Sequence, residues 1–166
     1  MIRRAASQTR FFWPEQRKQL EVLFDAILPG TVDSPGATDA NAAELVDRLL
    51  GAEPASYYEV PAWRRLYVSG LAALDAACRA RHHVALAAAT PAHATELVAD
   101  LAAGALHELP ATPVAVDQRQ LFGVLRAHCI EGCFADPRWG GNRSSVMWSW
   151  YGYLTPAQAF RRGGAP

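Results

Sequence analysis

The sequence predicts a single all-α domain, an irregular bundle of about five to six helices. Apolar residues recur at three- and four-residue spacing in several segments, and no segment alternates β-branched with polar residues. Alanine accounts for 32 of the 166 residues, and alanine favours close-packed helices. The length suits one domain. We expect an N-terminal extension over 1–13, the helical domain over 14–153 and a C-terminal tail over 154–166.

The first expected helix begins at Pro14, a residue favoured at the first helical position, and runs to about residue 28. Two Pro-Gly dipeptides then predict a loop. Asp39 or Asn41 can cap the second helix, whose apolar stripe ends at Gly51 in the position just past the helix.

The third expected helix opens at Pro61 and keeps an unbroken helical period as far as Cys78. Thr90 followed by Pro91 predicts the capped start of the fourth helix. The pattern of that helix stops at Leu109-Pro110. We expect the third and fifth helices to be central in the bundle because their stripes are continuous.

The fifth expected helix is capped by Asp117, with Gln120 three residues later as in a capping box. It must end before Asp136-Pro137, because proline disfavours helical geometry in the residue before it. Residues 144–153 are rich in aromatics and predict a short final helix.

Charge and hydropathy argue against a nucleic-acid or membrane partner, a signal peptide and a membrane span. Sixteen basic residues balance sixteen acidic residues, so neither nucleic acid nor an anionic membrane surface is expected as a partner. Arg3 and Arg4 are not followed by an apolar run long enough for a signal peptide. No run of about 18 apolar residues predicts a membrane span. We expect a cytoplasmic protein, or a periplasmic one if it is exported with a partner.

Three segments carry a resemblance to a known family: LFDAILPGTVDSPGA at 23–37, GLAALDAAC at 70–78 and EGCFADPRWGGNRSSVMWSWYGY at 131–153. In this order they resemble the gluconate 2-dehydrogenase subunit 3 family. The last segment is the specific one, although Trp139 stands where the family usually has Tyr and Cys133 where it usually has Phe. Members of the family commonly carry a twin-arginine signal, which this sequence lacks.

The resemblance implies a small accessory subunit without catalytic residues of its own. It would bind, stabilise or mature a large flavoprotein of the glucose-methanol-choline type that oxidises sugars, sugar acids or glycosides. FAD is then expected in the partner subunit, and a cytochrome or another acceptor would complete electron transfer. The alternative is a freestanding helical chaperone that holds an apo-flavoprotein transiently.

The residues themselves offer little independent chemistry. The chain has no G-x-G-x-x-G motif and no P-loop, so no cofactor is expected in it. The carboxylates of Asp25, Glu44, Asp47 and Asp75 fall on amphipathic helices, and we expect them to face solvent.

Histidines and cysteines are the remaining candidates for chemistry, and we expect no metal among them. His82 and His83 sit where a helix ends, which favours interaction with the helix dipole. His128, Cys129 and Cys133 continue an apolar stripe and are expected in the core. The alternatives are a soft-metal site that a partner completes, a self-contained metalloenzyme that uses these three residues, and a disulfide from one cysteine to the large subunit.

The segment DPRWGGN predicts a rigid protruding turn, because Asp136 can cap it, Pro137 fixes one φ angle and the two glycines permit positive φ. The turn is either purely structural or a docking site for a partner. Phe11, Phe12 and Trp13 are a second possible anchor, or they pack over the start of the first helix. The candidate partner-binding residues are Asp136, Pro137, Arg138, Trp139, Gly140, Gly141, Asn142, Arg143, Trp148, Trp150 and Tyr151.

Overall fold

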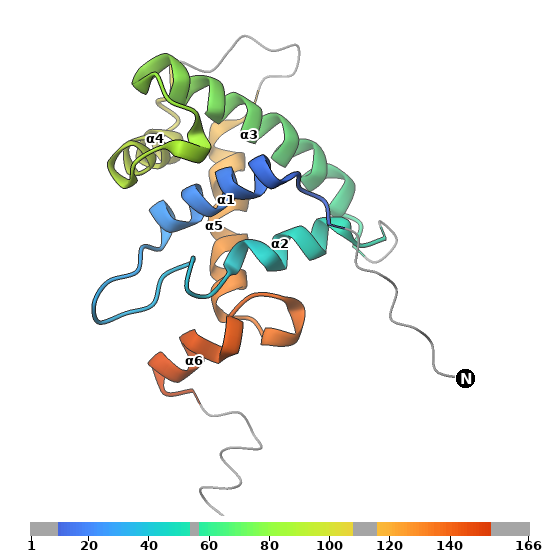
Figure 1. Ribbon diagram of the computed structural model, residues 1–166. Helices are drawn as coiled ribbons and strands as arrows, with labels where there is room; N and C mark the ends of the chain where they lie inside the picture. The colour runs from blue at the N-terminus through green and yellow to red at the C-terminus, as the bar shows by residue number, and fades with distance from the viewer. Residues whose placement is uncertain (1–9, 54–56, 108–115, 154–166) are drawn as a thin grey trace, which may run out of the picture.

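The computed structural model describes residues 10–53, 57–107 and 116–153. These residues form helices joined by loops, with no strand among them, and the predicted all-α class is confirmed (Figure 1). The elements are α1 (Pro14–Ile27), α2 (Ala42–Gly51), α3 (Val60–His82), η2 (Leu86–Ala88), α4 (Pro91–Ala103), α5 (Gln118–Phe134), η3 (Pro137–Trp139), η4 (Arg143–Ser145) and α6 (Val146–Tyr151), where η denotes a short 3-10 helix.

Helix α1 lies at the centre of the bundle and contacts α2, α3, α4 and α5 (Figure 1). Its side chains Leu20, Leu23 and Phe24 are almost completely buried. The expectation that the third helix would be central is therefore wrong. Helix α3 keeps one side toward solvent, where Val68 is 48% exposed, so its long apolar period covers the bundle from one side only.

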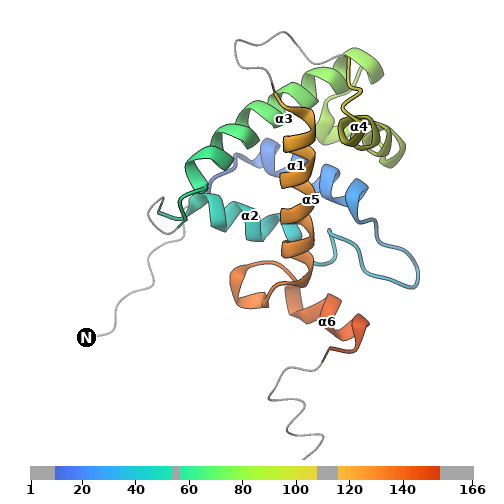
Figure 2. The same ribbon diagram turned by 180° about the vertical axis from the view of Figure 1, so that it is seen from behind.

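Helix α5 crosses behind α1 and α2 in Figure 1, and its outer face is uncovered when the molecule is seen from behind (Figure 2). Its inner face approaches α2 closely because Gly132 has no side chain. A Cβ atom at Gly132 would lie 2.4 Å from the carbonyl oxygen of Ala42. On the outer face, Ile130 and Phe134 are each 39% exposed.

The helix ends confirm two predicted caps and correct others. Thr90 accepts a hydrogen bond from the backbone of His93, and Asp117 accepts one from Gln120. Helix α4 ends earlier than expected, at Gly104, whose φ of 71° breaks the helical geometry. Gly51 is the last residue of α2 rather than the residue that follows it.

The start of α2 is not capped by a side chain. Asn41 precedes the helix with a φ of 53° and makes no side-chain capping bond. Its side-chain oxygen instead accepts a hydrogen bond of 2.7 Å from the guanidinium of Arg17. None of the helices in the described ranges is long and apolar enough to cross a membrane.

Candidate partner-binding surface

The loop between α5 and α6 is built around Asn142, which is completely buried. Its backbone N–H donates to the carbonyl of Gly132 at 2.7 Å, and its side-chain amide donates to the carbonyl of Ala135 at 3.1 Å. Its side-chain oxygen accepts from the backbone N–H of Met147 at 3.0 Å. One side chain therefore fastens the start of α6 to the end of α5.

The glycines of the loop allow this close contact. A Cβ atom at Gly141 would lie 2.0 Å from the carbonyl oxygen of Gly132, and Gly140 has a φ of 116°. Asp136 accepts a hydrogen bond of 3.0 Å from the backbone of Arg138, so the predicted aspartate cap of the turn is confirmed. The loop is rigid because backbone bonds and steric contact both fix it.

Two of the candidate partner-binding residues have structural roles. Gly141 and Asn142 are buried, which leaves neither surface for a partner. Trp139, Trp150 and Tyr151 are 60%, 52% and 74% exposed. The prediction of partner contact stays open for these and for the other candidates, Asp136, Pro137, Arg138, Gly140, Arg143 and Trp148.

Two tryptophan rings of α6 are held in place by hydrogen bonds from their indole N–H groups. The indole N–H of Trp148 donates to the carbonyl of Phe134, and that of Trp150 donates to the carbonyl of Asp33, both at 2.8 Å. The ring of Trp148 also lies 4.9 Å from that of Tyr153. We refer to the following partly or fully exposed residues as the aromatic surface: Phe134, Trp139, Trp148, Trp150, Tyr151 and Tyr153.

Phe134 and Tyr153 were missed as candidates by the sequence reasoning. Phe134 is 39% exposed and Tyr153 is 48% exposed. The apolar stripe of the fifth helix runs through Cys129 and Cys133, and Phe134 falls outside that stripe. That offset was a signal that could have identified it as outward-facing.

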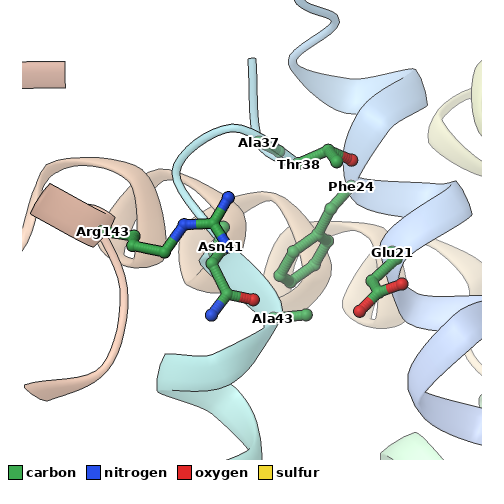
Figure 3. Close-up of a pocket in the computed structure, with 8 residues that line it drawn as sticks. Glu21, Phe24, Ala37, Thr38, Asn41, Ala43 and Arg143 are labelled. Carbon is green, nitrogen blue, oxygen red and sulfur yellow. The ribbon is translucent and has the colours of Figure 1, made fainter. Parts of the chain in front are cut away.

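Two hollows lie beside the start of α2 and share part of their lining. The first, of about 170 Å³, lies between Phe24 on α1 and Arg143, and Figure 3 shows the Arg143 side chain beside Asn41 at its edge. The second, of about 340 Å³, is lined on one side by Arg10 and Arg48. Asn41 and Arg143 line both hollows.

Asp47 is buried, at 1% exposure, and the expectation that it faces solvent is wrong. Its carboxylate accepts backbone hydrogen bonds from Phe11 at 2.8 Å and Phe12 at 2.9 Å. The guanidinium of Arg17 lies 3.4 Å from its second oxygen. A buried carboxylate is tolerated where N–H groups and a cation satisfy it, and distant parts of the chain supply both here.

Glu44 is also less exposed than expected, because Arg48 and Arg17 hold its carboxylate at 2.8 and 3.0 Å. Burial raises the pKa of Glu44, but the hydrogen bonds from the two arginines outweigh burial and the pKa is lowered overall. Asp75 is partly buried and accepts from the backbone of Leu86 at 2.8 Å. Asp25 is exposed, as predicted.

The Phe-Phe-Trp sequence before α1 divides between core and surface. Phe12 is 6% exposed, and its ring packs edge-on against Tyr67 at 5.6 Å. Phe11 lies beneath the guanidinium of Arg64 at 5.7 Å. Trp13 is 77% exposed. The predicted packing role therefore applies to the two phenylalanines, and Trp13 remains available to solvent.

His128, Cys129 and Cys133 lie in the core, as predicted. Tyr67 places its hydroxyl 2.9 Å from Nδ1 of His128, and burial lowers the pKa of His128 to about 4. The neighbouring Cys133 thiol and burial raise the pKa of Cys129, so Cys129 stays a thiol. Both cysteines are completely buried, which argues against a disulfide to a partner.

His82 is the last residue of α3, as the helix-dipole interpretation requires. Its ring stacks on that of His93 at 4.1 Å, with only 8° between the planes. Parallel rings cannot both direct a lone pair at one ion. Among the described residues, no group of three or more His, Cys, Asp or Glu side chains is arranged to hold a metal.

Comparison with protein-family models agrees with the sequence resemblance. A family model described as gluconate 2-dehydrogenase subunit 3 matches residues 14–155 of the chain. That span includes every helix described above and the whole Asn142 loop. No curated protein and no solved structure matches the chain.

Proposed function

This chain belongs to the gluconate 2-dehydrogenase subunit 3 family, and we propose that it is the non-catalytic accessory subunit of an FAD-dependent dehydrogenase. The partner would be a large flavoprotein of the glucose-methanol-choline type that oxidises sugars, sugar acids or glycosides. The accessory subunit would bind this flavoprotein through the aromatic surface and stabilise it.

The observation that best supports this proposal is that aromatic rings are held in fixed positions with faces exposed to solvent. Trp148 and Trp150 have their N–H groups already bonded within the chain, so a partner meets mainly their apolar faces. Tryptophan and tyrosine are enriched among residues that dominate binding energy. Rings fixed before binding lose little conformational entropy when a complex forms.

The outer face of α5 extends this surface along the helix. Gly123, Ala127, Ile130 and Phe134 follow each other at four- and three-residue spacing, and all four are exposed. Their spacing places them along one side of the helix. An apolar strip that continues into exposed aromatic rings favours a partner that is a large protein over one that is a peptide.

The flavin would belong to the partner, because the glycine pair of this chain offers no cradle for a diphosphate. Gly141 is packed against the carbonyl of Gly132, and the space beside Gly140 is occupied by Arg48. His128 is engaged with Tyr67 in the core. Hydride transfer to FAD and delivery of electrons to a cytochrome or another acceptor are therefore assigned to other subunits.

Coexpression tests the proposal. We would search the neighbouring reading frames for a large protein with a G-x-G-x-x-G motif, express it with and without this chain, and measure FAD content, sugar oxidation and elution volume. The expected result is a co-eluting complex, with FAD content and activity reduced when this chain is omitted. A large subunit that loads FAD and turns over fully alone would overturn the proposal.

The same experiment separates the chaperone alternative. A transient chaperone raises the FAD content of the flavoprotein but elutes separately from the active enzyme. A permanent subunit stays with the active enzyme in stoichiometric amount. The purified chain alone should be colourless, and bound flavin in it would contradict an accessory role.

A further inference from the structure

Arg143 is presented on a backbone that the fold holds in an uncommon conformation. Its own N–H donates to the carbonyl of Ala40 at 2.9 Å. Asn142 before it and Ser144 and Ser145 after it all have positive φ angles, of 45°, 55° and 56°. Such angles are unfavourable for residues other than glycine and persist where the surroundings enforce them, which is typical of ligand and partner sites.

The hollow of about 340 Å³ beside Arg143 carries an excess of positive charge. Its charged lining consists of Arg10, Arg48, Arg143 and Glu44, and Arg10 also lies 3.7 Å from the carboxylate of Asp47. Three positive charges minus these two negative charges leave one, which is that of Arg143. Glu44 is already bonded by Arg48 and Arg17. In a chain with no net charge, this local excess is a specific feature of the surface.

The Arg143 guanidinium is the group in this hollow that is free to bind. Its side chain is exposed and has no hydrogen-bond or ion-pair partner within the described residues. Figure 3 shows it extended beside Asn41, and it lines both hollows. A guanidinium pairs best with a planar oxyanion that can accept two parallel N–H bonds.

We propose that this hollow receives a carboxylate side chain of the partner dehydrogenase, bound by Arg143 with Arg48 beside it. The proposal rests on the proposed function, because it assigns a contact within that complex. A singly charged carboxylate suits the site better than a phosphate dianion, because Glu44 lines the same hollow and would repel the higher charge. The charged hollow would form the polar rim of the interface with the flavoprotein, next to the aromatic surface.

The first test compares Arg143→Gln with Arg119→Gln in the full chain. Arg119 is also exposed, but it lies at the opposite end of α5 from the loop. We expect the Kd for the flavoprotein to rise about tenfold or more for Arg143→Gln and to stay within about twofold for Arg119→Gln. The Kd of Arg143→Gln should also depend less on salt. Thermal unfolding of both variants verifies that each one folds.

Equal Kd values for the two variants would overturn the inference and leave the proposed function intact. Failure of the unaltered chain to bind the flavoprotein would overturn the proposed function and the inference together. The two failures are therefore distinguishable in one set of binding curves.

A second test identifies the carboxylate. Arg143→Lys supplies an amine that a carbodiimide can couple to a carboxylate in contact with it, forming an amide. We expect mass spectrometry to find a peptide joining position 143 to an Asp or Glu of the flavoprotein, with no such product for Arg119→Lys. A complex that forms normally but gives no cross-link at position 143 would overturn the inference.

Discussion

The carboxylate of Asp47, on α2, accepts a hydrogen bond of 2.9 Å from the backbone N–H of Phe12, which lies 35 residues earlier in the chain. This bond fastens the segment before α1 onto α2 and turns Phe12 toward Tyr67. The residues just before the helical domain are thereby part of its packing, and Asp47 is the group that holds them.

Replacing Asp47 with alanine should lower the free energy of unfolding by about 3 kcal/mol, because it leaves the backbone N–H groups of Phe11 and Phe12 without an acceptor. Urea unfolding followed by circular dichroism measures this change. Asp25→Ala is the matched control, because Asp25 is exposed, and it should change the free energy by less than about 0.5 kcal/mol. Equal effects of the two substitutions would refute the role given to Asp47.

Two glycines on α5 should respond in opposite directions to replacement by alanine. Gly123 is exposed, and a Cβ atom there would meet nothing within 4 Å, so Gly123→Ala should stabilise the helix by up to about 1 kcal/mol. Gly132→Ala would place a Cβ atom 2.4 Å from the Ala42 carbonyl and should destabilise by about 2 kcal/mol. Unfolding midpoints of the two variants that shift in the same direction would contradict the packing described for α2 and α5.

Burial of His128 makes stability depend on pH. The pKa of His128 is about 4 in the folded chain and near its usual value of 6.5 in the unfolded chain. Between these values the unfolded chain binds a proton that the folded chain does not. The stabilisation of the folded chain that comes from neutral, buried His128 is therefore complete above pH 6.5. It is lost as the pH falls toward 4, by about 3 kcal/mol in total.

The variant His128→Gln removes this titration, and its loss of stability between pH 7 and pH 4 should be smaller than that of the unaltered chain by about 3 kcal/mol. Denaturant unfolding at several pH values measures the difference. His107→Gln serves as the control, because His107 is exposed. A variant His128→Gln that loses as much stability as the unaltered chain would show that His128 does not carry the effect.

The aromatic surface should dominate binding of the flavoprotein. Tyr151 is 74% exposed on α6, and Tyr151→Ala should raise the Kd about tenfold or more, through loss of apolar contact. Tyr58→Ala is the matched control, because Tyr58 is 88% exposed and comes two residues before α3, a helix that lies away from α6 (Figure 1). Biolayer interferometry gives both constants, and a larger effect at Tyr58 would place the interface elsewhere.

Local sequence signals predicted the helices well. Pro14, Thr90 and Asp117 each mark a helix start that the structure confirms, because a proline or a capping side chain acts within a few residues of itself. The aspartate cap of the 136–142 turn was predictable for the same reason. The family resemblance of that turn, confirmed by the family model, was likewise carried by adjacent residues.

Features that depend on distant residues could not be predicted in this way. Asp47 looked like a surface residue because its partners, Phe11, Phe12 and Arg17, lie about thirty residues or more away in the chain. Asn142 looked like a candidate for partner contact, yet it is the buried centre of the loop. Helical period does not reveal which polar residue the tertiary fold will enclose.

The bond from the Trp150 indole to the Asp33 carbonyl spans 117 residues and joins α6 to the loop between α1 and α2. This hydrogen bond cannot form until the ribosome has synthesised almost the whole domain. A nascent fragment that ends before α6 would lack most of the aromatic surface, namely Trp148, Trp150, Tyr151 and Tyr153, so recruitment of the flavoprotein would have to follow translation of this chain.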